Sequence, residues 1–514
     1  MSKTIIIIGA GLAGLSAALQ AAENGCNVKL VSSLPSERAQ SVMAEGGINA
    51  ALNTKDENDS PEEHFTDTIK AACGLADPNA VWGMTQAAPE LVHWLLKLGV
   101  KFNMSGYDDV DLRNFGGQKK KRTAFAQSDT GKQIMTAMID AVRRKEASGM
   151  VERFSHHSFL TLRLCGNICC GCVIRDEYSQ ETVELPGDAV IVAIGGMHGL
   201  FGNTTGSLSN TGEVTAELFR LGVPLANGEM IQYHPTTVKC GGKRMLISEA
   251  ARGEGGRLFA MKDGKQWYFM EEKYPELGNL MPRDITAREI WKVSHESEVF
   301  LDMTEISEEI ISNKLSGLAD DCMTYLHKDI RKEPVSVLPG IHYFMGGILV
   351  DEQHRTPIQN LYAAGECCAQ YHGANRLGGN SLLGALYGGR VAAKSACEQA
   401  DVVDLSCATQ IDFPPASQIS EIKQLNKVMQ ETMGVVRNEN TLLNGIKTVQ
   451  ALTGNLPLLG MAVLKSALAR KESCGAHWRE DYPKSNDDDY LKTTVAIFDG
   501  KQIQISFVPV PERR

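Results

Sequence analysis

The chain lacks several features that would place it in particular protein classes. No apolar run among its 514 residues reaches the roughly 18 residues that a membrane-spanning helix needs. The apolar N-terminus leads into glycines after one lysine, without a cleavage-type site, which is not typical of a signal peptide. The chain also has fewer basic than acidic residues: 52 Lys and Arg and 62 Asp and Glu give a net charge of −10. We therefore expect no direct membrane insertion and no nucleic-acid partner.

The cysteines lack the spacing of a metal or cluster site. Thirteen are present, but none forms the CxxCxxC run of an iron–sulfur cluster. Four of them fall in LCGNICCGCVIRD, which also fits two strand pieces around a Gly166-Asn167 turn. That interpretation makes them small buried residues and favours no metal site. Free cysteines without a signal peptide indicate a reducing cytoplasm.

What the chain does have is a strand–helix–strand pattern at its start. The strand-type residues Thr4–Ile8 run into the glycine-rich turn Gly9–Gly14, and an Ala-rich helix pattern follows over Leu15–Glu23. A second strand begins at Asn27. A GxGxxG turn in this order predicts a bound dinucleotide.

Each glycine of the turn has a separate expected function. Gly9 permits the tight turn, Gly11 lets the backbone approach a pyrophosphate, and Gly14 lets helix and strand pack closely. The helix N-terminus then offers free N–H groups to the phosphates. The second strand ends without the usual acid, so a hydroxyl such as that of Ser32, or a group elsewhere, must contact the ribose. The motif alone does not choose FAD over NAD.

The composition of 43% hydrophobic and 22% charged residues fits a globular protein of about two to four domains. A shift to longer loops and more charge marks residues 228–343 as a domain inserted into the dinucleotide fold. The predicted organisation is a discontinuous cofactor domain (1–227 and 344–400), the inserted domain (228–343), a helical domain (401–485) and a C-terminal tail (486–514). A hairpin is predicted in the tail, over 493–498 and 502–508.

Several blocks together resemble one family. They are GAGLAG (9–14), AEGG (44–47), FGGQ (115–118), YHPTT (233–237), SEAARGEGG (248–256), PRD (282–284), HYFMGG (342–347), LYAAGE (361–366), HGANRLGGNSLLGALYGGR (372–390) and ALARKESCGAHWREDYP (467–483). The sequence resembles the flavoprotein subunits of succinate dehydrogenase and fumarate reductase, whose wider family includes L-aspartate oxidase. The resemblance implies an α/β protein with a Rossmann-like FAD-binding domain, an inserted α+β capping domain and a C-terminal helical domain.

The resemblance also implies which residues hold FAD. Glu213 stands where the family commonly has Asp, and its contact with the ribose is the least specific of the set. The implied cofactor-binding residues are Gly9, Gly11, Gly14, Ser32, Gly46, Gly47, Glu213, Glu366, Ser381 and Leu382.

Reduction of a dicarboxylate double bond needs a hydride, a proton and fixed positive charge for two carboxylates. The family blocks supply such side chains in His234, Arg283, His342 and Arg376. Arginine suits carboxylates because its guanidinium fork binds both oxygens. The first two lie on the inserted domain and Arg376 on the cofactor domain, so closure of the inserted domain is expected to complete the site and exclude water.

By resemblance, Arg283 is the proton donor, and Glu249 and Arg252 re-protonate it. The alternative for those two is a buried ion pair. By resemblance also, His234 and Ser248 hold one carboxylate, with Ser in place of the more common Thr. The residues implied for the other carboxylate are His342 and Arg376.

Two departures from the family pattern refine the function. Gln40 occupies the place of the histidine that bonds covalently to the flavin in membrane-complex members. Because an amide cannot form that bond, we expect non-covalent FAD. In this family the covalent link raises the flavin potential, so its absence implies fumarate reduction as the preferred direction. Phe115 stands where L-aspartate oxidases carry an acid for the substrate amino group, which favours a dicarboxylate without an amine. L-aspartate oxidation, reduction of another short 2-enoate and a non-catalytic flavin carrier stay open.

No cluster motif lies on the chain, so electrons must reach FAD from outside. By resemblance the donor is a separate iron–sulfur subunit, and residues 401–485 are the expected contact region. A small soluble donor is the alternative. The expected location is the cytoplasm, with attachment to the inner face of the membrane through partner subunits.

Overall fold

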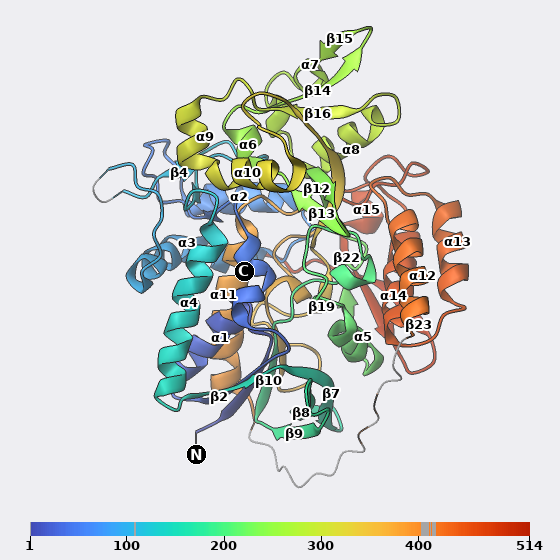
Figure 1. Cartoon of the computed structure of the whole chain (residues 1–514). Coiled ribbons are helices and arrows are strands. Elements are labelled where there is room, and N and C mark those ends of the chain that lie inside the picture. The colour runs from blue at the N-terminus through green and yellow to red at the C-terminus, as the bar shows by residue number, and fades with distance from the viewer. Residues whose placement is uncertain (1, 107–108, 402–410, 412, 414–417) are drawn as a thin grey trace.

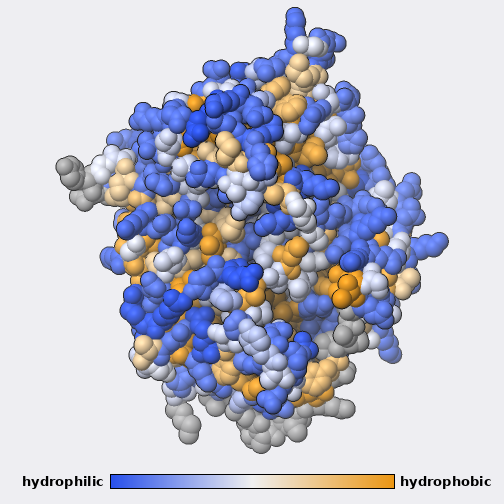
Figure 2. Space-filling model, viewed as in Figure 1, coloured by the Kyte–Doolittle hydropathy of each residue, from blue (hydrophilic) through white to orange (hydrophobic). Residues whose placement is uncertain are grey.

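The computed structural model describes residues 2–106, 109–401, 411, 413 and 418–514. Figure 1 shows three regions: a lower region around a parallel sheet, an upper region with α7 to α10, and a helical group formed by α12 to α14. On the face seen in Figure 2 the surface is mainly hydrophilic, with smaller hydrophobic areas between. Among the described residues, no helix combines the length and the apolar character needed to span a membrane.

The lower region is built on a five-stranded parallel sheet. Its order is β20 (Leu361–Ala363), β10 (Ala189–Val192), β1 (Thr4–Ile8), β2 (Asn27–Ser32) and β6 (Val151–Ser155). Residues 5–8 and 189–192 are buried without alternation. Such continuous burial is expected of parallel strands, because both faces of their sheet are covered.

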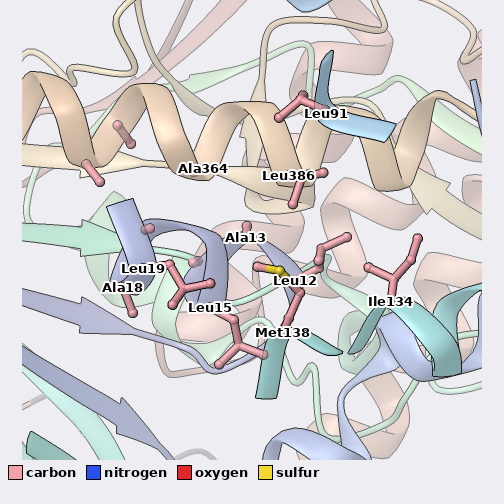
Figure 3. Packing of buried hydrophobic residues seen from close by; sticks show 14 of the residues in the cluster. Leu12, Ala13, Leu15, Ala18, Leu19, Leu91, Ile134, Met138, Ala364 and Leu386 are labelled. Atoms are coloured by element: carbon pink, nitrogen blue, oxygen red, sulfur yellow. The ribbon is translucent and has the colours of Figure 1, made fainter. Parts of the chain in front are cut away.

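Helices cover one face of this sheet. They are α1 (Leu12–Glu23), α3 (Pro78–Leu98), α4 (Thr130–Ala147) and α11 (Asn380–Gln399). Figure 3 shows how their side chains interlock around the start of α1, with Leu12 and Leu15 facing Leu386 and Met138. Since α1 and α11 lie side by side, residues far apart in the sequence form one core.

The other face is covered by the antiparallel strands β7 (His157–Cys165), β8 (Ile168–Asp176) and β9 (Thr182–Pro186). Cys169 and Cys172 of β8 are buried against Ile6 and Val190 of the parallel sheet. The interpretation as small core residues on a strand is therefore confirmed for Cys169, Cys170 and Cys172, whereas Cys165, at the end of β7, is only half-buried. Within the described ranges, no group of three or more His, Cys, Asp or Glu side chains could hold a metal ion.

The upper region falls within the predicted inserted domain, residues 228–343, which we call the capping region. It contains the sheet β13 (Lys243–Leu246), β12 (Ile231–Cys240), β18 (Leu338–Phe344), and a second sheet of β15 (Lys265–Trp267), β14 (Arg257–Lys262), β16 (Val299–Asp302) and β17 (Val335–Ser336). The helices that carry site residues here are α6 (Glu249–Gly253) and α8 (Arg283–Val293). Leu258, Ile290 and Leu301 belong to a core of its own. The chain enters on β12 and returns on the neighbouring β18, which supports the predicted insertion, although its boundaries stay a prediction.

The C-terminal region contains α12 (Ile419–Thr432), α13 (Glu439–Val449) and α14 (Asn455–Ala469). Residues 402–410, 412 and 414–417 of the predicted helical domain lie outside the described residues. The predicted hairpin is confirmed as β22 (Lys492–Phe498) and β23 (Ile503–Pro509). It is no separate tail, because β22 pairs with β11 (Leu225–Ala226), which in turn pairs with β19 (Gly347–Leu349). The hairpin thus closes a sheet built largely from the cofactor region.

Candidate active site

One large cavity, of about 890 Å³, joins the cofactor region to the capping region. The turn from β1 to α1 and the first residues of α11 line one part of it. His234, Arg283 and Arg376 line the other part. The predicted dinucleotide site and the predicted substrate site are therefore parts of one continuous space.

The glycine turn fits the three functions expected from the sequence. A Cβ on Gly9, whose φ is +109°, would overlap the carbonyl oxygen of Ala193, and a Cβ on Gly14 would overlap that of Gly9. These two glycines are therefore required by close packing of the protein itself. A Cβ on Gly11 would meet nothing nearer than Ser41 Oγ at 3.7 Å. Gly11 leaves open space at the N-terminus of α1, where a pyrophosphate fits.

The other predicted cofactor residues also border this space. Ser32 Oγ is buried and has no hydrogen-bond partner in the part of the chain that the structure describes, which leaves it free for a ribose hydroxyl. Glu366 Oε1 accepts the backbone N–H of Phe344 at 3.1 Å. The remaining residues of the set that line the cavity are Gly46, Gly47, Glu213, Ser381 and Leu382.

Gly46 and Gly47 owe their identity mainly to protein packing. A Cβ on Gly46 would lie 2.6 Å from Cζ of Phe115, and one on Gly47 would lie 2.5 Å from the carbonyl oxygen of Ala124. Phe115 is itself buried and lines the cavity, so it presents an apolar ring there. Gln40 also lines the cavity, from the short 3₁₀ segment Gln40–Met43.

Arg283, Glu249 and Arg252 form one buried hydrogen-bonded chain. Arg283 donates to Glu249 Oε2 from Nε at 2.9 Å and from Nη2 at 2.5 Å. Arg252 Nη2 donates to the other oxygen, Oε1, at 3.3 Å, and the backbone N–H of Gly116 donates to it at 3.1 Å. Burial alone would raise the pKa of Glu249, but the two guanidinium groups outweigh it and hold the pKa below its usual value. The structure thus brings the predicted donor and relay residues together.

Two histidines that line the cavity are in edge-to-face contact. The ring centroids of His234 and His342 are 5.1 Å apart. Burial, followed by the nearby Arg283, lowers the pKa of each well below its usual value, so both rings are neutral at ordinary pH. His234 Nδ1 lies 3.1 Å from the carbonyl oxygen of Thr236 and 3.3 Å from its backbone N–H, while its Nε2 is buried with no partner among the described residues. Nε2 of the neutral ring is therefore available to a ligand.

Arg376 supplies a second buried cation at the same place. Its guanidinium carbon lies 4.3 Å from the ring centroid of Tyr343, and its Nε is buried with no hydrogen-bond partner in the described ranges. Ser248 lines the cavity as the N-cap of α6, where its hydroxyl accepts the N–H of Ala250 at 3.4 Å. The arrangement offers several unused donors and positive charge to an anion.

Three side chains of this site were not predicted from the sequence. Gln232 accepts Arg283 Nη1 at 3.1 Å and donates to the carbonyl of Arg376 at 2.8 Å, so it holds both arginines. Its position two residues before His234 on one strand was a usable signal, since residues i and i+2 share a face. Thr205 and Glu45 had no such signal.

Glu45 is a half-buried acid beside the site, and its Oε2 is buried. It lines the cavity with Ser248, to which it is hydrogen-bonded, and its Oε2 has no partner among the described residues. Burial, followed by the charge of Asp321, raises the pKa of Glu45 to about 8. This carboxyl is therefore largely protonated near neutral pH.

A parallel sheet with a glycine turn, joined by one cavity to a cluster of arginines and histidines, is typical of a dinucleotide-dependent oxidoreductase. Comparison with known proteins gives the particular family. Residues 4–382 match the family described as FAD binding domain, and residues 452–513 match the fumarate reductase flavoprotein C-terminal domain.

Relatives extend over nearly the whole chain. The succinate dehydrogenase flavoprotein subunit of Bacillus subtilis is 38% identical over 549 residues, covering 96% of this chain and 94% of its own. L-aspartate oxidase of Pyrococcus furiosus is 32% identical over 495 residues, covering 94% and 97%. Among solved structures, a variant of E. coli quinol fumarate reductase FrdA superposes with a TM-score of 0.89 at 26% identity, covering 99% and 97%.

The chain belongs to the succinate dehydrogenase/fumarate reductase flavoprotein family, and it is an FAD-dependent oxidoreductase of that type. The resemblance seen in the sequence is thereby confirmed, as is the α/β FAD-binding fold with a further C-terminal domain. The glycine turn and the unpartnered Ser32 hydroxyl fit the binding of FAD.

Proposed function

We propose that this protein reduces fumarate to succinate. The observation that carries the proposal is the shared cavity, in which His234, His342 and Arg376 surround Arg283 beside the cofactor turn. When bound, FAD supplies the hydride that this reduction needs. The protein's own residues bind the substrate, supply the proton and exclude water.

Two carboxylates require two sets of donors. His234 and Ser248 hold one, and His342 and Arg376 hold the other. Because the rings are neutral, the histidines serve as hydrogen-bond donors while the charge comes from the arginines. Donors fixed in advance at a buried site stabilise developing negative charge more strongly than water does. The same contacts draw electrons from the double bond and prepare it for hydride addition.

Arg283 donates the proton to the substrate carbon next to the one that receives the hydride. An arginine holds its proton tightly, so the proton must be replaced as it leaves. Glu249, bonded to Arg283 through one oxygen and to Arg252 through the other, is placed to pass a proton from Arg252. One hydride and one proton convert the alkene into the saturated dicarboxylate.

The site is divided between regions of the chain. His234 and Arg283 lie on the capping region, His342 on its returning strand β18, and Arg376 on the cofactor region. Closure of the capping region over bound substrate completes the site and excludes water. The proposed division of the chain is 1–227 with 344–400, 228–343, 401–485 and 486–514, of which the last segment joins the cofactor region through β22.

FAD binds without a covalent link, because Gln40 cannot form one. The residues that hold it are those of the β1–α1 turn, Ser32, Gly46, Gly47, Glu213, Glu366, Ser381 and Leu382. Phe115 offers no partner to an ammonium group, which favours fumarate over L-aspartate. Without a flavin link, succinate oxidation is the less favoured direction.

An iron–sulfur subunit brings the electrons. The B. subtilis relative is named as a subunit, and the solved E. coli relative belongs to a quinol fumarate reductase. The proposed contact region is 401–485, and the proposed location is the cytoplasm at the inner face of the membrane. Co-purification of tagged chain with an iron–sulfur protein from its own cells tests this part.

The test of the reaction uses purified holoenzyme. After denaturation and filtration, yellow flavin should appear in the filtrate. Enzyme reduced with dithionite should reoxidise faster with fumarate than with buffer alone. If the flavin stays on the protein, the interpretation that Gln40 excludes a covalent link is wrong. Reduction of the oxidised enzyme by L-aspartate alone, with iminoaspartate formed, would favour the aspartate oxidase alternative.

A further inference from the structure

Two consecutive threonines lie between the cofactor side and the substrate side of the cavity. Thr205 Oγ1 lies 2.8 Å from His342 Nδ1. Thr204 Oγ1 lies 3.0 Å from Nδ1 of His198, a fully buried ring whose Nε2 is 3.6 Å from Glu366 Oε1. Each threonine hydroxyl thus contacts one histidine; His342 lines the cavity, whereas His198 is buried and contacts the lining residue Glu366.

The backbone of this dipeptide is attached to its neighbours by bonds that do not involve the Thr205 hydroxyl. The N–H of Thr205 donates to the carbonyl of Ile341 at 3.0 Å, and the N–H of Arg244 donates to the carbonyl of Thr204 at 3.1 Å. These bonds attach the loop to β18 and to β13 of the capping region. Removing one hydroxyl should therefore leave the loop in place.

A neutral histidine can donate from only one of its two ring nitrogens. At Nδ1 of His234 the backbone of Thr236 offers both an acceptor and a donor, with the carbonyl oxygen 3.1 Å away and the N–H 3.3 Å away. His342 has no such backbone donor at Nδ1 among the described residues. Its Nδ1 contact is the hydroxyl of Thr205.

We propose that Thr205 is a positioning residue for the reaction: its O–H donates to His342 Nδ1 and so keeps the ring proton on Nε2, where the substrate carboxylate accepts it. The inference rests on the proposed function of His342. In the opposite tautomer, Nδ1–H would donate to Thr205, whose hydroxyl would turn to the carbonyl of Ile341, 3.4 Å away. His342 would then present a bare nitrogen to a carboxylate, and the two would repel.

The variant Thr205→Val removes the hydroxyl and keeps the shape, whereas Thr205→Ser keeps the hydroxyl. Leu208→Ala is the matched control in the same loop, because Leu208 is exposed and does not line the cavity. The first measurement is the tautomer of His342 by NMR of the ¹⁵N-histidine-labelled holoenzyme, with the signal assigned by its loss in His342→Gln. Wild type and Thr205→Ser should show the Nε2–H form, and Thr205→Val should show a mixture.

The second measurement is kinetic. Thr205→Val should lower kcat/KM for fumarate about 10-fold, with a higher KM, because a fixed buried hydrogen bond is lost. Thr205→Ser and Leu208→Ala should stay within about 2-fold of wild type, and FAD affinity by fluorescence titration should be equal in all four proteins.

An Nδ1–H tautomer in the wild type, or a Thr205→Val enzyme with unchanged tautomer and kinetics, would overturn the inference. If wild type gives no fumarate-dependent reoxidation, the proposed function fails instead. The NMR measurement needs no substrate and still decides whether Thr205 sets the tautomer.

Discussion

Arg283 and Glu249 meet through a single oxygen atom. Both Nε and Nη2 of Arg283 donate to Glu249 Oε2, while Oε1 of the same carboxylate receives Arg252 and a backbone N–H. The carboxylate therefore has one side toward the proposed proton donor and one side toward the proposed proton source. This division suits a group that passes protons, and it also keeps a charged carboxylate stable while buried.

The first prediction concerns this carboxylate. Glu249→Gln keeps the size of the side chain but cannot carry the proton, so fumarate reduction should fall at least about 100-fold. FAD content should not change. The measurement is the fumarate-dependent reoxidation rate of the reduced holoenzyme in a stopped-flow instrument.

The matched control is Glu254→Gln. Glu254 lies on the same segment but pairs with Lys314 at 3.1 Å, outside the proposed relay. It should retain most of the activity. Full activity in Glu249→Gln would remove Glu249 from the proton path and leave a structural ion pair.

The second prediction concerns Arg376. Arg376→Lys keeps one positive charge but loses the planar fork that binds both carboxylate oxygens. The KM for fumarate should rise by about 10- to 100-fold, since a hydrogen bond to a charged group contributes about 1.5–3 kcal/mol. Binding of succinate, followed as a change in flavin absorbance, should weaken by a similar factor. Equal affinity in the two proteins would mean that Arg376 does not hold the substrate.

The third prediction follows from Glu45. Its pKa is raised from 4.5 to about 8 in the folded protein, so the folded state binds a proton more tightly than the unfolded state does. The stability that this group contributes is complete below pH 4.5 and is lost as the pH rises to about 8, with an upper limit of about 5 kcal/mol.

Glu45→Gln removes this titration. The unfolding temperature of the variant relative to wild-type holoenzyme should therefore rise between pH 5 and pH 9, measured in closely spaced buffers by differential scanning calorimetry. A difference that is constant across this range would mean that Glu45 is ionised in the folded protein.

The fourth prediction separates two glycines of one turn. Gly14→Ala forces a Cβ onto the carbonyl of Gly9, so the protein should lose several degrees of thermal stability or fail to fold. Gly11→Ala meets no such obstacle and should fold normally, yet bind FAD more weakly. Thermal unfolding and FAD titration of both variants test this, and equal FAD affinity in Gly11→Ala would place the pyrophosphate elsewhere.

Local elements were predictable where one signal determined them. The sequence pattern predicts helices over 78–98 and 130–147, and α3 (Pro78–Leu98) and α4 (Thr130–Ala147) have these bounds, because a proline at N1 of α3 and clear apolar periodicity mark them. The same pattern predicts a helix over 459–472, whereas α14 begins at Asn455 and ends at Ala469, and its first turn contains Pro457. A proline there is tolerated because the first N–H groups of a helix need no partner.

Long-range partners were not predictable from local pattern. The contact of Thr205 with His342 and the pairing of β22 with β11 join distant parts of the chain, and neither hydroxyl spacing nor strand alternation identifies the partner. The residues of the site were named through family blocks, and the structure brings Arg283, Glu249 and Arg252 into one hydrogen-bonded chain. Their chemical roles stay predictions until the variants are measured.

The order of strands in the parallel sheet has a consequence for folding during translation. β1 is synthesised well before its sheet neighbour β10, which comes from residues 189–192, and before β20, from residues 361–363. At about 5–20 residues per second, tens of seconds separate β1 from β20. The proposed FAD site therefore cannot be complete until its last residue, Leu382, has been synthesised, and until then the apolar residues Ile5–Ile8 lack the neighbours β10 and β20 that bury them.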